Sequence, residues 1–105
     1  MKFGLSEETF TAITNVFDSF PEVESVILYG SRAKGNFQNG SDLDLTLKGG
    51  KLNQHTLNKL SLALDDLYLP YTFDLSIFHH IHNTELLDHI ERVGKVIFER
   101  EKVIL

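Results

Sequence analysis

A short stretch in the first half of the chain constrains the fold more than any other feature. Residues 25–29 (SVILY) form an apolar run of the kind that fills a covered β-strand. Gly30 ends the run at a point where the backbone must turn, and Ser31 is suited to cap a short helix. A second strand is expected over residues 42–48. The chain is therefore predicted to pass from one buried strand through a tight turn and a short helix into another strand.

The second predicted strand begins with two carboxylates. Asp42 and Asp44 are two residues apart, so in a strand they project from one face, with Cα atoms roughly 6–7 Å apart. Leu43, Leu45 and Leu47 then face the core. The plain alternative is a solvated turn leading into an edge strand. Because aspartate is disfavoured in strands, a functional reason for the pair is favoured.

The glycine turn and the carboxylates together indicate a phosphate site with a metal ion. A helix N-terminus that follows a glycine offers unpaired backbone N–H groups and the positive end of a dipole, and both can bind a phosphate. Two carboxylates beside that phosphate would repel it unless a cation lies between them. Mg²⁺ is the expected ion because it binds carboxylate and phosphate oxygens together.

The rest of the chain alternates helical and strand patterns. The next elements expected are a helix capped by Ser6 and stopped by Pro21, and a helix that Asn53 caps and that runs to Tyr68. A strand over 71–78, a helix capped by Asn83 and ending at Gly94, and a strand over 95–98 are expected to follow. This alternation predicts an α/β (α+β) fold, a small mixed β-sheet with helices packed on it. At 105 residues the chain is expected to be a single domain, residues 1–105.

Two motifs, residues 30–35 (GSRAKG) and 41–45 (SDLDL), together resemble the signature of the polymerase β-type nucleotidyltransferase superfamily. Within that superfamily, the chain resembles the minimal nucleotidyltransferase (MNT) group in being short. The family pattern requires a third carboxylate on a later strand, and Asp74 lies in the β-rich apolar segment 71–78. The resemblance extends from about residue 26 to residue 78 and implies a polymerase β-like fold.

The resemblance implies a catalytic site that also binds metal, made of Asp42, Asp44 and Asp74. Two Mg²⁺ ions would be held there, the first by Asp42 and Asp44 and the second shared with Asp74. Asp74 could also accept the proton of the incoming hydroxyl as a general base. The alternative for Asp74 is a carboxylate that simply faces solvent, since an unpaired buried charge would be costly.

The nucleotide, with ATP as the expected substrate, would be bound by the residues of the first motif. Gly30 and Ser31 would hold the β- and γ-phosphates through backbone N–H and hydroxyl groups. Arg32 and Lys34 either brace the phosphates or form the solvated face of a one-turn helix, and the sequence does not separate these alternatives.

The MNT group is commonly paired with a helical protein of the HEPN type, as an antitoxin that adenylylates its toxin. The resemblance therefore implies a Mg²⁺-dependent nucleotidyltransferase that moves a nucleoside monophosphate, AMP from ATP, onto a hydroxyl of a partner protein. A non-catalytic nucleotide-binding module that neutralises its partner by complex formation is the alternative. Transfer to a small molecule is disfavoured because little chain follows Asp74 to form an acceptor domain. The apolar tail 103–105 could support homo- or hetero-oligomers, or pack on its own core.

The composition disfavours several classes of function. The net charge of −5 argues against direct binding along a nucleic-acid backbone, which needs a basic surface. The chain has no cysteine, and no segment approaches a membrane-spanning length, so a cytoplasmic protein is expected. The spacing of His79, His80 and His82 does not indicate a metal site, although a loop role near substrate stays open. The pattern assigns no role to His89.

Overall fold

The computed structural model describes residues 2–38 and 40–100. Its centre is a four-stranded sheet in the order β3-β2-β1-β4. The strands are β1 (Ser25–Tyr29), β2 (Leu43–Lys48), β3 (Phe73–Ile77) and β4 (Lys95–Glu99). β1 is antiparallel to both β2 and β4, whereas β2 and β3 are parallel. The predicted small mixed sheet is confirmed.

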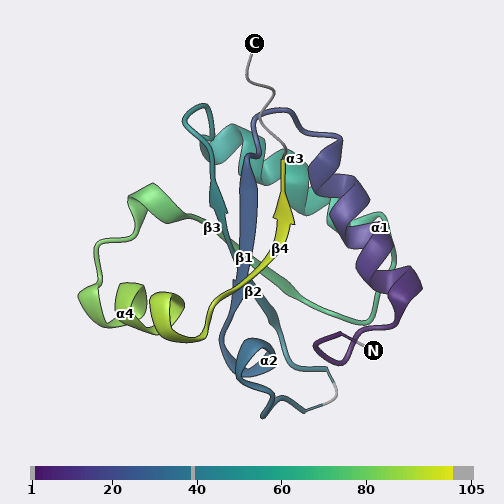
Figure 1. Ribbon diagram of the computed structural model, residues 1–105. Coiled ribbons are helices and arrows are strands. Elements are labelled where there is room, and N and C mark those ends of the chain that lie inside the picture. The colour runs from purple at the N-terminus through teal and green to yellow at the C-terminus, as the bar shows by residue number, and fades with distance from the viewer. Residues whose placement is uncertain (1, 39, 101–105) are drawn as a thin grey trace.

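Helices lie on both faces of this sheet. α1 (Glu7–Asp18) and α3 (Gln54–Asp65) pack together on one face, and α4 (Thr84–Val93) lies on the other side, at the left of Figure 1. The short α2 (Ser31–Lys34) lies below the sheet in that view, and η1 (Phe78–His80) follows β3. No helix among the described residues is long and apolar enough to cross a membrane.

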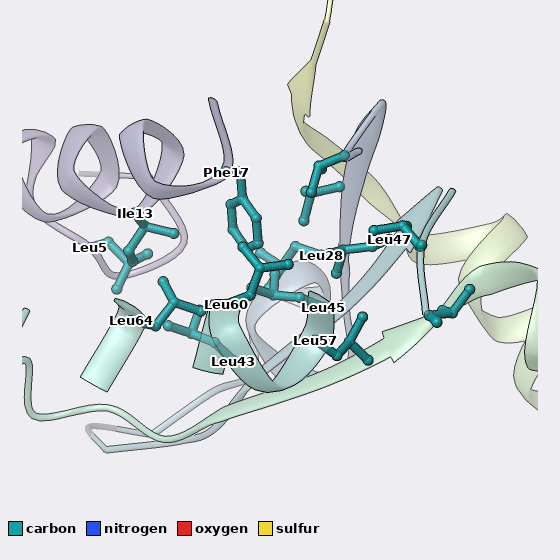
Figure 2. Packing of buried hydrophobic residues seen from close by; sticks show 14 residues of the cluster. Leu5, Ile13, Phe17, Leu28, Leu43, Leu45, Leu47, Leu57, Leu60 and Leu64 are labelled. Carbon is teal, nitrogen blue, oxygen red and sulfur yellow. The ribbon is translucent and has the colours of Figure 1, made fainter. Parts of the chain in front are cut away.

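The core fills the space between the sheet and the pair α1–α3. Leu43, Leu45 and Leu47 are all buried, with Leu45 opposite Leu28 and Leu47 opposite Val26 on β1. Figure 2 shows these leucines meeting the side chains that the two helices send inward. The helix residues that complete this cluster are Ile13, Phe17, Leu57, Leu60 and Leu64. Because the alternate residues of the strands point away from this core, the other sheet face is left for the site.

The predicted caps of the three long helices are confirmed. In each, a side-chain oxygen accepts a hydrogen bond from the backbone N–H three residues later, at 3.1, 2.9 and 3.0 Å for Ser6, Asn53 and Asn83. α3 is shorter than predicted and ends at Asp65 rather than Tyr68. The chain tightens there through a hydrogen bond from the Tyr68 N–H to the Asp65 carbonyl, and Tyr68 takes a positive φ of 53° that a helix cannot continue.

Two predicted details of the central motif are wrong by one residue. Gly30, not Ser31, occupies the cap position of α2, because Gly30 takes φ 78° and ψ −156°, a conformation open mainly to glycine. β2 begins at Leu43 rather than Asp42. Asp42 therefore lies just before the strand, where the Leu43 N–H already bonds to the Thr72 carbonyl at 2.9 Å. The predicted apolar tail 103–105 lies outside the described residues.

Candidate active site

One row of polar side chains crosses three strands on the face opposite the core. Tyr29 on β1 is directly opposite Asp44 on β2, and Asp44 is in register with Asp74 on the parallel strand β3. Residues paired in this way share a face of the sheet. The register thus brings together two of the three predicted carboxylates and adds a tyrosine that the sequence motif did not assign.

The third carboxylate, Asp42, reaches the same region from the segment just before β2. It is exposed, as is Asp74 on the edge strand β3, whereas Asp44 is partly buried between them. Asp42 is two residues before Asp44 in the chain, and its negative charge adds to the raised pKa of Asp44. All three predicted carboxylates are therefore gathered around the start of β2 and β3.

The carboxylates repel one another. Burial raises the pKa of Asp44 above its usual range, and the charges of Asp74 and then Asp42 raise it further, while His89 acts in the opposite direction. Across residues 2–38 and 40–100, no lysine or arginine forms an ion pair with any of the three. A cation placed among them would offset this repulsion.

The donor set fits Mg²⁺ shared with a substrate rather than a closed metal site. Among the described residues, no group of three or more His, Cys, Asp or Glu side chains is placed so that it could hold a metal ion by itself. Mg²⁺ usually keeps several waters and is held by one or two carboxylates together with substrate phosphates. Asp42, Asp44 and Asp74 provide oxygen ligands of that kind.

Tyr29 shares the electrostatic environment of these carboxylates. Burial raises the pKa of its hydroxyl, the nearby Ser76 side chain lowers it, and the charges of Asp44 and Asp74 raise it again. The hydroxyl therefore stays protonated near neutral pH, as a neutral polar group beside the acidic pair.

Gly30 connects this row to α2. A Cβ at position 30 would collide with Oδ2 of Asp44, and its positive φ of 78° adds strain for any other residue. The carboxylate of Asp44 thus lies directly against the backbone of the turn. The predicted closeness of the glycine turn and the carboxylates is present in the structure.

The other three residues predicted to bind nucleotide occupy different environments. Ser31 opens α2, whose first N–H groups have no intrahelical acceptor, and Lys34 is exposed on the same turn. Arg32 is only 2% exposed. Its Nη1 donates to the Phe3 carbonyl at 2.8 Å, and its Nε donates to the Ser41 carbonyl at 3.0 Å. Its guanidinium is thus used within the protein, and we leave it out of the proposed nucleotide contacts.

α4 contributes a residue to the site that the sequence pattern did not assign. Nε2 of His89 accepts a hydrogen bond from the Gly30 N–H at 3.0 Å, and its ring packs edge-on against Tyr29. No local signal distinguishes His89 from the other helix residues, because its partners are far away in the sequence. The Gly30 N–H, predicted to contact phosphate, is therefore already paired.

His79 and His80 lie away from the carboxylates. His79 and His80 belong to η1, which follows the C-terminal end of β3, whereas Asp74 is near the start of that strand. At the strand rise of about 3.3 Å per residue, the Cα of Ile77 at the end of β3 lies roughly 10 Å from that of Asp74, and His79 follows beyond it. The loop role near the substrate that the sequence left open is not supported by this placement.

The fold agrees with the family that the sequence matches. The family model "Polymerase beta, Nucleotidyltransferase" matches residues 11–103. The chain therefore belongs to the polymerase β-type nucleotidyltransferases. No curated protein matches the chain in sequence.

Similar solved structures are chains of toxin–antitoxin complexes. A chain of a toxin–antitoxin complex with AMP-PNP is similar at a TM-score of 0.68 and 20% identity, covering 92% of this chain and 76% of that one. A second is from the tri-AMPylated Shewanella oneidensis HEPN toxin in complex with MNT antitoxin (TM-score 0.66, 17% identity, 91% and 74% covered). A third is from the MntA–HepT complex (0.66, 18%, 90% and 74%). These likenesses show that the chain has the polymerase β-like fold.

Proposed function

We propose that this chain transfers AMP from ATP to a hydroxyl group of a HEPN-type partner protein and acts as the antitoxin of that partner. The observation that carries the proposal is the in-register pair Asp44 and Asp74, which face one side of the sheet beside the Gly30 turn. Family membership supports nucleotidyl transfer. The similar structures support the partner class, since one contains AMP-PNP and another a tri-AMPylated HEPN toxin.

In this proposal the three carboxylates and the residues of α2 have separate tasks. Asp42 and Asp44 would hold Mg²⁺, and Asp74 would share a second ion. When bound, Mg²⁺ would neutralise charge on the triphosphate and on the departing pyrophosphate. The Ser31 hydroxyl and the first N–H groups of α2 bind phosphate oxygens, with Lys34 as a further cation at the exposed side.

The transfer itself needs one proton acceptor. Asp74 takes the proton of the acceptor hydroxyl while the hydroxyl oxygen forms a bond to the α-phosphorus and the bond from that phosphorus to pyrophosphate breaks. Asp74 suits this task because it is exposed on the edge strand β3. A macromolecular acceptor can approach an edge strand without displacing the core. We extend the proposal to the cytoplasm as the place of the reaction.

The test is transfer of label from α-³²P-ATP with Mg²⁺ onto a HEPN-type protein from the same organism. Wild type is compared with Asp44→Asn and with the double variant Asp42→Asn/Asp44→Asn. Asp65→Asn, an exposed aspartate at the end of α3, is the matched control. Label on the acceptor with wild type and the control, but with neither site variant, is the expected result. A stable complex without label from any of the four nucleotides would favour the non-catalytic binding module instead.

A further inference from the structure

A single hydrogen bond joins α4 to the turn at Gly30. Nε2 of His89 accepts from the Gly30 N–H at 3.0 Å, in a partly buried position and across 59 residues of sequence. Within residues 2–38 and 40–100, no other α4 side chain forms a hydrogen bond to a different element. Because Nε2 is the acceptor, neutral His89 carries its proton on Nδ1.

His89 also touches the row of site residues. Its ring meets the ring of Tyr29 edge-on, with centroids 6.1 Å apart and planes at 79°. The Asp44 carboxylate packs against the same glycine. His89 therefore contacts both Gly30 and Tyr29, and it is close to Asp44, a proposed metal ligand.

The C-terminal half of α4, which carries His89, packs against β1. Ile90, the next residue, is buried at 4% exposure. Gly94 lets the helix end approach the strand, since a Cβ there would lie 2.8 Å from Cγ2 of Ile27 and would collide with the Ile90 carbonyl. His89 is thus presented from a fixed element rather than from a loop.

We propose that His89 is a positioning residue that holds the Gly30 turn in the form that receives the triphosphate. Glycine has wide conformational freedom, so a turn at φ 78° and ψ −156° needs contacts on both sides to stay in one state. The Asp44 carboxylate packs on one side of Gly30, and His89 binds its N–H. This inference rests on the proposed function, because it assigns the turn a triphosphate ligand.

The experiment compares His89→Leu, which removes the acceptor, with His89→Gln, whose amide oxygen can replace Nε2. A net hydrogen bond is worth a factor of about 3- to 10-fold, so His89→Leu is expected to raise the KM for ATP by that amount and to change kcat by less than about twofold. His89→Gln is expected to restore most of the loss. His55→Leu, at an exposed position near the start of α3, is the matched control and should match wild type.

A second measurement is independent of transfer. In ¹H–¹⁵N spectra the Gly30 amide should be protected from exchange in wild type and His89→Gln, and should lose that protection in His89→Leu. Calorimetric titration with Mg²⁺–ATP measures the Kd of the same variants, which should follow the order expected for the KM. A wild type that binds Mg²⁺–ATP without transferring AMP would contradict the proposed function alone. Unchanged KM and Kd in His89→Leu, a gain of activity, no rescue by glutamine, or no Mg²⁺–ATP binding by wild type would each overturn the inference.

Discussion

Replacing Arg32 with methionine should lower the stability of the fold and leave phosphate binding largely intact. Arg32 is 2% exposed, and its guanidinium donates to the carbonyls of Phe3 and Ser41 at 2.8 and 3.0 Å. It also lies over the rings of Phe37 and Tyr71, 4.9 and 4.8 Å from their centroids. Arg32 thus ties the N-terminal segment, α2 and the segment that leads to Asp42 together.

The expected loss follows from these contacts. Methionine keeps an apolar stem of similar length but donates nothing, so two carbonyl groups lose their partner, at about 1–3 kcal/mol each. Two cation–π contacts add about 0.5–1 kcal/mol each. Part of this is offset because a buried charge no longer has to be desolvated. The free energy of unfolding should fall by about 2–4 kcal/mol, a large share of a typical total of about 5–15 kcal/mol.

Equilibrium unfolding in urea, followed by circular dichroism, measures this change. Lys34→Met is the control, since Lys34 is exposed on the same short helix, and its effect on stability should stay within about 0.5 kcal/mol. The KM for ATP separates the two roles that the sequence left open for Arg32. If Arg32→Met unfolds at the same urea concentration as wild type but raises this KM, the reasoning from burial is refuted and Arg32 contacts phosphate.

Three further changes test other parts of the structure. Because the pKa of Asp44 is raised in the folded state, its ionised form lowers stability as pH rises above the ordinary aspartate pKa. In urea unfolding without Mg²⁺, Asp44→Asn should therefore be more stable than wild type at pH 7, by less than about 1 kcal/mol, and equally stable near pH 3. Equal stability of the two proteins at pH 7 would contradict this. Gly30→Ala should cost about 1–2 kcal/mol more stability than Gly40→Ala, because both residues have positive φ but only a Cβ at position 30 would collide with Asp44. Equal losses in the two variants would refute the collision between that Cβ and Asp44. Leu45→Ala should lose about 2–5 kcal/mol by the same assay, since Leu45 is fully buried, and a loss under about 1 kcal/mol would contradict its place in the core.

The sequence predicts the parts of this fold that depend on neighbours in the chain. Caps such as Ser6 and Asn53 act over three residues, and the alternation of leucines with other residues in β2 is a local pattern. The two aspartates stand out for the same reason, because they interrupt an apolar strand next to a glycine turn. Their roles remain predictions, although the structure brings them together.

The features that the sequence does not reveal depend on distant partners. His89 meets Gly30 across 59 residues, and no periodicity marks it among the α4 residues. Arg32 lies in a short polar stretch that reads equally well as a phosphate contact or an exposed turn. Only the packing of Phe3 and Tyr71 around it makes it a buried arginine. Tertiary contacts of this kind decide burial, which a local pattern cannot supply.

The core and the candidate site are linked through the register of β2. Leu45 faces the helices, and Asp44 and Thr46, its two neighbours, face the other way, paired with Asp74 and Ser76 on β3. A slip of one residue would turn Asp44 into the core and Leu45 out to the site, which the burial of the leucines strongly opposes. The packing that stabilises the fold therefore also fixes which carboxylates meet at the start of β2 and β3. Asp44 and Asp74 accordingly keep their alignment despite the burial and the mutual repulsion that raise the pKa of Asp44.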